Sequence, residues 1–281
     1  RFKKVGNAYL TPGFNDYDYY LRYQTYNITE LLEENNIIEV HMGDGWYKGR
    51  IGLNKEREQS NLYGDEYKLC LHLLIEYKDG MTMNILSDES WKVKASKEVA
   101  NNIYDGEEVD YTLPDEPLEG VIISEEKYKL IPDFGSLIIE REILIPELNI
   151  SPKKEHILDF KQNMVGFVRY KGFLQYNQEM KLSHGEVLQN ESFFNANLRT
   201  AKEILKYKGD GKKRIYEPKF TYFGFRYVLV EGLDKVNPND FEGVVIYTNL
   251  EKTINCKTDN PKINKLIQNT IWGQKGNFLD V

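Results

Sequence analysis

Short runs of alternating apolar and polar residues, separated by turn signals, recur through most of the chain. The clearest run covers residues 215–230, where aromatic and β-branched residues dominate and Gly224 interrupts them. This composition is typical of a pleated, half-buried strand, and both Pro218 and a glycine within the run disfavour a helix. Gly224 predicts a bulge or a close approach of another backbone.

Two further patterns predict a hairpin and a loop in the first half of the chain. Apolar runs at 67–77 and 81–86 flank Lys78-Asp79-Gly80, a turn sequence typical of a β-hairpin. Cys70, inside the first of these runs, is expected to be a small buried hydrophobe. Residues 43–49 contain three glycines, which predict a loop with unusual backbone angles.

The tail changes from strand periodicity to helix periodicity. The sequence Asp259-Asn260-Pro261 supplies a helix cap and a proline for the first turn. Apolar residues then follow at helical spacing, at Ile263, Leu266, Ile267 and Ile271. An amphipathic helix of this kind needs a surface on which to bury its apolar stripe.

These patterns predict a mainly β fold, with two antiparallel β-sandwich (jelly-roll-like) domains followed by one C-terminal α-helix. Strand patterns fill 5–109, the Pro- and charge-rich stretch 110–135 is typical of a connector, and a second set of strands follows it. With 281 residues, the chain is long enough to build two hydrophobic cores.

Composition and charge exclude several classes of partner. The formal net charge is −7, whereas a nucleic-acid binder needs a basic face to meet phosphates. No apolar run approaches membrane-spanning length, so we expect neither a nucleic-acid partner nor a membrane partner. The two cysteines and four histidines show no disulfide or metal-ligand spacing. Both ends of the sequence look cut, so targeting segments do not indicate a compartment.

Five motifs occur in order along nearly the whole chain. They are YLTPGFNDYD at 9–18 with YQTY at 23–26, GDGWYKGR at 43–50, DFKQNMVGFV at 159–168, NLRTAK at 197–202 with EPKFTYFGFRYV at 217–228, and WGQKGNFL at 272–279. In this order and spacing they resemble the bacterial α-L-rhamnosidases, a family of glycoside hydrolases. The family usually has glycine where Lys161 stands, and a lysine there would forbid the backbone freedom that glycine permits.

The resemblance implies two β-sandwich domains, at 1–112 and 134–255 with a connector at 113–133, followed by an (α/α)6 barrel. It implies that 256–281 is the first helix of that barrel. It implies hydrolysis of terminal α-L-rhamnose with inversion, in which one carboxylate protonates the leaving oxygen and another activates water. The family's general acid lies beyond the position of Val281, so we expect no catalytic residue in this chain and no activity from it alone. The implied partners are a rhamnose-containing glycoside and the chain's own catalytic barrel. No cofactor is required, and calcium is possible.

The first candidate sugar-binding residues are Asp18, Asp44 and Trp46. An aromatic face suits the C–H side of a sugar ring, and carboxylates suit its vicinal hydroxyls. Some family members carry a calcium-dependent rhamnose-binding site, so Asp16, Asp18 and Asp44 are also candidate calcium ligands. The alternative is that Trp46 packs in the first sandwich while the glycines beside it shape a turn.

Asn195, Asn197 and Arg199 form the second candidate set, because loops carry function more often than cores do. The alternative is that these side chains tie their loop to the barrel. Glu186 and Glu217 are expected to be exposed strand carboxylates rather than a catalytic pair. Three functions remain open: the non-catalytic β portion of an α-L-rhamnosidase, a calcium-dependent rhamnose-binding module, and an all-β interaction module unrelated to sugar hydrolysis.

Overall fold

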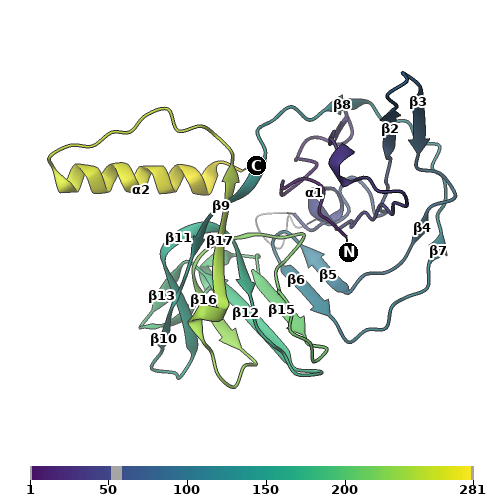
Figure 1. Cartoon of the computed structure of the whole chain (residues 1–281). Coiled ribbons are helices and arrows are strands. Elements are labelled where there is room, and N and C mark those ends of the chain that lie inside the picture. Colours follow the sequence, from purple (N-terminus) through teal and green to yellow (C-terminus); the bar gives the residue numbers. More distant parts are fainter. Residues whose placement is uncertain (1, 52–58, 280–281) are drawn as a thin grey trace.

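The computed structural model describes residues 2–51 and 59–279, and its largest element is one nine-stranded sheet (Figure 1). The main path of the sheet runs β5-β6-β15-β12-β16-β11-β17-β9, and β10 pairs with β11. Its strands are β5 (Glu98–Asn102), β6 (Gly106–Asp110), β9 (Ile138–Leu144), β10 (Glu147–Ile150), β11 (His156–Tyr170), β12 (Glu179–Gly185), β15 (Ile204–Lys208), β16 (Phe223–Glu231) and β17 (Phe241–Thr248).

The main hydrophobic core lies against this sheet. Leu158, Leu182 and Phe225 are fully buried at its centre, and Phe160 packs edge-on against Phe225 with ring centroids 5.6 Å apart. Burial alternates along much of β16, which confirms the half-buried strand predicted within 215–230. Alternating apolar residues thus form one face of the sheet, as the two-residue period requires.

The prediction for Gly224 is wrong. Gly224 pairs in regular register with Val165 of β11, and a Cβ built on it would meet no heavy atom within 4 Å. The bulge lies on the neighbouring strand instead, where the register of β11 shifts between Asp159 and Met164. No backbone approaches Gly224 closely enough to require glycine.

Short elements make up the amino-terminal part of the chain (Figure 1). They are β1 (Leu21–Tyr23), the 3-10 helix η1 (Thr29–Leu31), α1 (Gly45–Lys48), β2 (His72–Glu76), β3 (Thr82–Leu86), β4 (Lys92–Val93), β7 (Glu119–Gly120) and β8 (Leu130–Pro132). β2 and β3 form the predicted hairpin. Two local predictions fail: α1 replaces part of the expected loop at 43–49, and Cys70 is exposed rather than buried.

The remaining elements include the predicted carboxy-terminal helix. They are β13 (Val187–Gln189), β14 (Ser192–Phe194), η2 (Ala196–Leu198), η3 (Pro238–Asp240) and α2 (Pro261–Asn277). The side chain of Asn260 caps α2 by accepting from the backbone N–H groups of Lys262 and Ile263. The mainly β class with one long C-terminal helix is therefore confirmed. Among the described residues, no helix is long and apolar enough to cross a membrane.

Strand β6 joins the amino-terminal part of the chain to the main sheet. It pairs in parallel with β15, from Ile204 opposite Gly106 to Lys208 opposite Asp110, whereas the other neighbouring strands of this sheet are antiparallel. Gly106 has φ +114, and a Cβ on it would overlap the backbone carbonyl of Ile204. Only glycine allows this close approach at the first residue of the pairing.

We expect Gly106→Ala to lower the free energy of unfolding by about 3 kcal/mol or more, because both the backbone conformation and the contact with Ile204 exclude a methyl group. Urea unfolding followed by circular dichroism measures the change. Gly120→Ala is the matched control, since a Cβ there meets no heavy atom within 4 Å. Equal stability of the two variants would show that β6 does not approach β15 as described.

Candidate functional site at the junction of the terminal helix and the sheet

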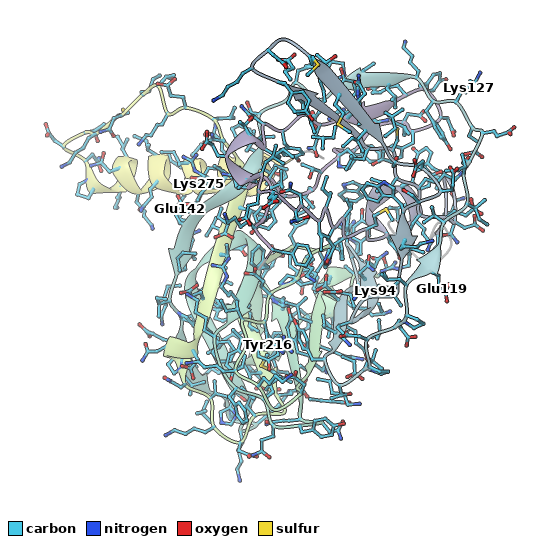
Figure 2. All side chains as sticks on the ribbon, turned by 45° about the vertical axis from the view of Figure 1, so that its right-hand side comes forward. Lys94, Glu119, Lys127, Glu142, Tyr216 and Lys275 are labelled. Atoms are coloured by element: carbon cyan, nitrogen blue, oxygen red, sulfur yellow. The ribbon has the colours of Figure 1, made fainter. Side chains whose placement is uncertain are left out.

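The carboxy-terminal half of α2 lies against the main sheet. Trp272 packs against the main core, and a methyl group added at Gly276 would lie 3.5 Å from the side chain of Val165 in β11. Lys275 forms an ion pair with Glu142 of β9, and the two residues lie side by side in Figure 2. The Lys275 Nζ also lies 4.3 Å from the centroid of the Trp272 ring. These contacts fix the end of α2 over β11 and β9.

Opposite the helix, β11 carries its bulge. The backbone of Lys161 has φ +62 at this point, a left-handed conformation that residues other than glycine rarely adopt. Its N–H donates to Asp159 Oδ1 at 2.7 Å, and its ammonium pairs with Glu147 at 2.7 Å and with Asp159 at 3.3 Å. The expectation that lysine forbids this conformation is wrong, because hydrogen bonds and ion pairs on both sides hold it.

An ion pair between the buried Asp159 and the partly exposed Arg226 anchors the bulge to β16. The Asp159 carboxylate accepts two hydrogen bonds from the Arg226 guanidinium, at 2.8 and 3.0 Å. Burial alone would raise the pKa of the Asp159 carboxyl, but the hydrogen bonds from Arg226 and Lys161 outweigh burial and hold this pKa below its ordinary value. Asp159 is therefore ionised at neutral pH, and its role is to fix the backbone that leads into residues 162 and 163.

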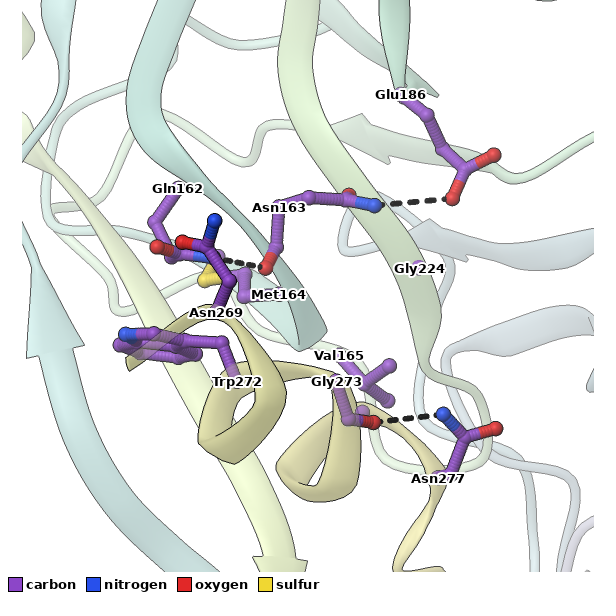
Figure 3. A pocket seen from close by; sticks show the side chains of 11 residues that line it. Gln162, Asn163, Met164, Val165, Glu186, Gly224, Asn269, Trp272, Gly273 and Asn277 are labelled. Atoms are coloured by element: carbon purple, nitrogen blue, oxygen red, sulfur yellow. Dashed lines mark hydrogen bonds between the residues drawn. The ribbon is translucent and has the colours of Figure 1, made fainter. Parts of the chain in front are cut away.

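A cavity of about 440 Å³ separates the bulge from α2. Its polar lining residues are Gln162, Asn163 and Glu186 from the sheet side and Asn269 and Asn277 from the helix. Figure 3 shows Asn163 pointing toward Glu186, while Asn269 and Trp272 rise from the helix on the other side. Asn163 Nδ2 donates to Glu186 Oε1 at 3.1 Å, and Gln162 Nε2 donates to the Asn163 carbonyl at 2.8 Å.

The donor and acceptor set of this cavity suits a neutral, hydroxylated ligand. Amide groups can both donate and accept, so they match hydroxyl groups in either role. Trp272 supplies an aromatic surface beside them. Among the lining residues Glu186 is the only carboxylate, and it is already bonded to Asn163. The cavity therefore offers binding groups, not the pair of carboxylates that glycoside hydrolysis commonly uses.

Trp46 and Asp44 occupy the short helix α1 and its N-cap. Trp46 is only 8% exposed and lies edge-on to Phe14 and Tyr104, with ring centroids 5.8 and 6.1 Å away. Asp44 accepts a hydrogen bond from the Tyr67 hydroxyl, and its carboxylate lies 3.7 Å from the Lys48 ammonium. The packing alternative for Trp46 thus describes its surroundings, while its sugar-binding role stays a prediction.

Asp16 and Asp18 are exposed in the loop before β1. The backbone N–H of Asp18 donates to Asp16 Oδ1 at 3.2 Å, which is a local turn contact. Across residues 2–51 and 59–279 the structure brings together no group of three or more His, Cys, Asp or Glu side chains that could hold a metal ion. Calcium binding by Asp16, Asp18 and Asp44 stays a prediction.

The second candidate set stays together in one loop. Asn195 precedes η2, Asn197 lies within it, and Arg199 ends it with φ 58. Asn197 and Arg199 are exposed and Asn195 is half-buried. None of the three lines the cavity beneath α2. Their sugar-binding role also stays a prediction.

Sequence reasoning found part of this cavity's lining, because Gln162 and Asn163 belong to the motif at 159–168, but it did not single out Glu186 or the helix side as a site. Glu186 was expected to be an exposed strand carboxylate, but it is half-buried beside the bulge. Trp272 was recognised only as the first residue of the motif at 272–279. Asn269, Trp272 and Asn277 share one face of α2 at helical spacing, and this polar-aromatic face was the available signal.

Comparisons with known proteins agree with the fold. The model of the α-L-rhamnosidase N-terminal domain matches residues 3–125, and the model of the bacterial α-L-rhamnosidase concanavalin-like domain matches residues 150–247. The α-L-rhamnosidase of Streptomyces avermitilis is 31% identical over 99% of this chain and 28% of its own length. One from Formosa agariphila is 29% identical over 99% of this chain and 32% of its own length.

Solved structures give the same result. The α-L-rhamnosidase of Aspergillus terreus has a TM-score of 0.87 at 30% identity, covering 98% of this chain and 34% of its own. The Streptomyces avermitilis enzyme, crystallised with L-rhamnose, has a TM-score of 0.86 at 29% identity, covering 99% of this chain and 28% of its own. The chain thus has the two β-rich domains of a glycoside hydrolase family. It belongs to the α-L-rhamnosidases, and it spans about a third of the length of these relatives.

We expect Lys161→Gly to be more stable than Lys161→Ala by about 1 kcal/mol, because only glycine adopts φ near +60° without a steric penalty. Both variants lose the ion pairs with Glu147 and Asp159, so their difference isolates the backbone term. Urea unfolding measures it. If the alanine variant were equally stable, the left-handed conformation at Lys161 would be refuted.

Proposed function

We propose that this chain is the non-catalytic β-domain portion of an α-L-rhamnosidase that hydrolyses terminal α-L-rhamnose from glycosides. The observation that carries the proposal is the agreement of two separate rhamnosidase domain models, at 3–125 and 150–247, with structural matches over 98–99% of the chain. The relatives are about three times longer, so most of each relative lies outside the matched part. The comparisons give no support to a separate calcium-dependent binding module or to an unrelated interaction module.

The chemistry of the cavity supports a non-catalytic role. Inverting glycosidases use two carboxyl groups about 6.5–9.5 Å apart, one as acid and one as base. The cavity beneath α2 has Glu186 alone among its lining residues, and the amide of Asn163 occupies one of its oxygens. A single, hydrogen-bonded carboxylate supplies only one of the two proton transfers. The general acid and base are therefore assigned to the catalytic barrel of the parent enzyme.

Support of that barrel is the role we assign to α2. The carboxy-terminal half of the helix is held on the sheet by Trp272 and Lys275. Its first half presents Ile263 and Leu266, which are 45% and 65% exposed. An apolar stripe of this kind gains stability only when another surface covers it. We assign α2 as the first helix of the catalytic barrel, which makes it the rigid link between sheet and barrel.

The cavity beneath α2 lies between this helix and the sheet. We propose that it helps to position a rhamnose-containing substrate. Its amides and the Trp272 ring match hydroxyl groups and the C–H face of a sugar. The loop with Asn195, Asn197 and Arg199 is assigned a secondary part in the same task, because exposed polar side chains on a loop are free to meet a ligand.

Hydrolysis of 4-nitrophenyl α-L-rhamnopyranoside tests the proposal. We expect no turnover by the folded 281-residue chain and turnover with inversion by the complete gene product that contains it. Proton NMR of the first-formed sugar anomer reports the stereochemistry. Turnover by the chain alone would refute the non-catalytic assignment. A folded complete product that cleaves other glycosides but no rhamnoside would refute the substrate.

A further inference from the structure

Two carboxyl groups at the pairing of β6 with β15 have no part in the roles assigned above. Glu107 lies within β6, opposite Leu205 of β15, and is only 3% exposed. Glu203 comes directly before β15, whose first residue, Ile204, pairs with Gly106. Both side chains therefore belong to the β6–β15 junction, which joins the amino-terminal part of the chain to the main sheet.

One oxygen of Glu107 fastens the segment that leads into β16. Its Oε2 accepts hydrogen bonds from the backbone N–H groups of Lys219 and Phe220, each at 3.0 Å. The Phe220 ring in turn lies against Gly43, where an added methyl group would be 2.4 Å from the ring. The other oxygen, Oε1, is buried and has no hydrogen-bond partner among the described residues. Glu107 thus ties β6 to the segment before β16 and, through Phe220, to the region of α1.

Two buried carboxyl groups meet a single ammonium group at this point. Glu98, on β5, has a side chain that is only 4% exposed, and its Oε1 pairs with Lys219 Nζ at 2.5 Å. Within the described part of the chain, the hydrogen-bond partners of Glu107 are backbone N–H groups alone. A buried ionised carboxylate without a cation beside it is costly, and such a group commonly binds a proton instead. The arrangement of charges thus favours a protonated Glu107.

Burial raises the pKa of the Glu107 carboxyl to about 7, in the direction that this arrangement requires. The backbone N–H groups of Lys219 and Phe220 oppose the rise, because they stabilise the charged form, while the negative charge of Glu98 adds to it. Glu107 therefore changes its charge near neutral pH, and it does so inside the structure.

The other titratable groups around Glu107 come from three directions. On β15, burial raises the pKa of Tyr207 well above its ordinary value. Just after β6, burial raises the pKa of Tyr111 to about 12. In the segment before α1, the His41 ring lies 3.3 Å from the Lys219 ammonium. The two phenols therefore stay uncharged at the pH values at which Glu107 titrates.

Glu203 has similar surroundings at the start of the strand pairing. Its Oε2 is shielded from solvent and has no hydrogen-bond partner among the described residues. Burial raises the pKa of its carboxyl to about 8, and the charge of Glu186 adds to the rise. Burial lowers the pKa of His184 to about 4, so the imidazole that contacts the Glu203 carbonyl is uncharged at neutral pH. A second cavity, of about 240 Å³, has Glu203, Trp46 and Gly224 among its lining residues, so the junction is not fully packed here.

An ionised carboxylate of the same junction responds to pH in the opposite direction. Asp105, in the turn between β5 and β6, binds the Arg50 guanidinium at 2.6 Å and the Lys202 ammonium at 3.2 Å. Burial alone would raise the pKa of Asp105, but the hydrogen bonds from Arg50 and Lys202 outweigh burial and hold this pKa below its ordinary value. The phenol of the adjacent Tyr104 lies under the Arg50 guanidinium. This clamp is lost in acid, so it does not respond to a change from neutral to alkaline pH.

We propose that Glu107 and Glu203 make the β6–β15 junction a pH-dependent joint. While both carboxyls are protonated, β6 stays paired with β15. When they ionise, the pairing opens and the amino-terminal part loosens from the main sheet. The opening is local, because β11, β12, β16 and β17 keep their antiparallel partners. The joint involves neither sugar binding nor hydrolysis, so it does not depend on the proposed function.

The direction of the effect follows from where the protons are bound. Opening exposes both carboxyls to water, where the pKa of each returns to the ordinary range of a glutamate. Because the pKa of each is higher in the closed form, the closed junction loses stability as the pH rises through about 7 for Glu107 and about 8 for Glu203. Above the higher value both forms have released these protons, and the loss is complete.

Amide hydrogen exchange of the 281-residue chain, followed by peptide mass spectrometry, tests the proposal. The parent chain is compared with Glu107→Gln at each pH, so the pH dependence of the exchange chemistry cancels. Each carboxyl changes the opening equilibrium by up to about tenfold per pH unit. We therefore expect the parent-to-variant ratio of exchange rates in β6 and β15 to rise about tenfold or more between pH 5.5 and pH 7.5. In β11 and β17 the ratio should stay within about twofold.

Two further variants complete the test. Glu203→Gln should give a similar rise in β6 and β15 that continues to higher pH, because this carboxyl titrates later. Glu108→Gln is the matched control, since Glu108 is an exposed neighbour on β6 that pairs with Lys206 at 3.2 Å. It should keep the pH profile of the parent chain. A ratio that does not change with pH, or one that rises equally in β11 and β17, would overturn the local joint.

Carbon NMR of the glutamate carboxyl groups gives a measurement on the parent chain itself. We expect two signals with midpoints at about pH 7 and about pH 8, from Glu107 and Glu203. If every glutamate signal titrated in the ordinary range, the proposal would be overturned, whether or not the variants fold. Two late signals together with the exchange ratios expected above would establish it.

Discussion

The parallel pairing of β6 with β15 is the constraint on which the other features of the structure depend. It joins the amino-terminal part to the main sheet, and it requires glycine at position 106 because the two backbones approach so closely. Arg50 strengthens the same junction, since its guanidinium binds Asp105 at 2.6 Å and the Thr200 carbonyl at 2.9 Å. This pairing holds close together the regions that carry Trp46 and Glu203, which are far apart in the sequence. The second cavity is therefore a product of the junction.

The middle of the sheet, where β16 pairs with β11, depends on a charge pair. Asp159 and Arg226 tie β11 to β16 where the register shifts, and removing Arg226 would leave the buried Asp159 carboxylate with less compensation for its charge. Lys161, with its left-handed backbone, lies two residues after Asp159. Two residues further on, the Asn163 side chain donates a hydrogen bond to Glu186. A bulge of this kind redirects side chains that a regular strand would place on alternate faces. It supplies the sheet side of the cavity beneath α2.

Local patterns in the sequence were sufficient for local structure. The turn at Lys78-Asp79-Gly80 and the cap at Asn260 both predicted their elements correctly, because each depends on neighbouring residues. The pairing of β6 with β15 was not predictable from the sequence. The two strands are far apart along the chain, and periodicity describes single strands, not which strands pair. Cys70 was judged from its apolar neighbours, although burial depends on what covers them. Glu203 gave no signal, because positive φ at a glutamate arises only when Tyr104 and His184 hold its backbone.

Gly224 is shared by the two cavities of this region. It lines both cavities, and its missing side chain leaves open space instead of enabling a close backbone contact. Glu186 lines one cavity and Glu203 the other, so neither cavity has two carboxyl groups among its lining residues. Their remaining influence on each other is electrostatic: the charge on Glu186 helps keep Glu203 protonated. A protonated carboxyl can both donate and accept a hydrogen bond, so at neutral pH Glu203 adds no negative charge beside Glu186.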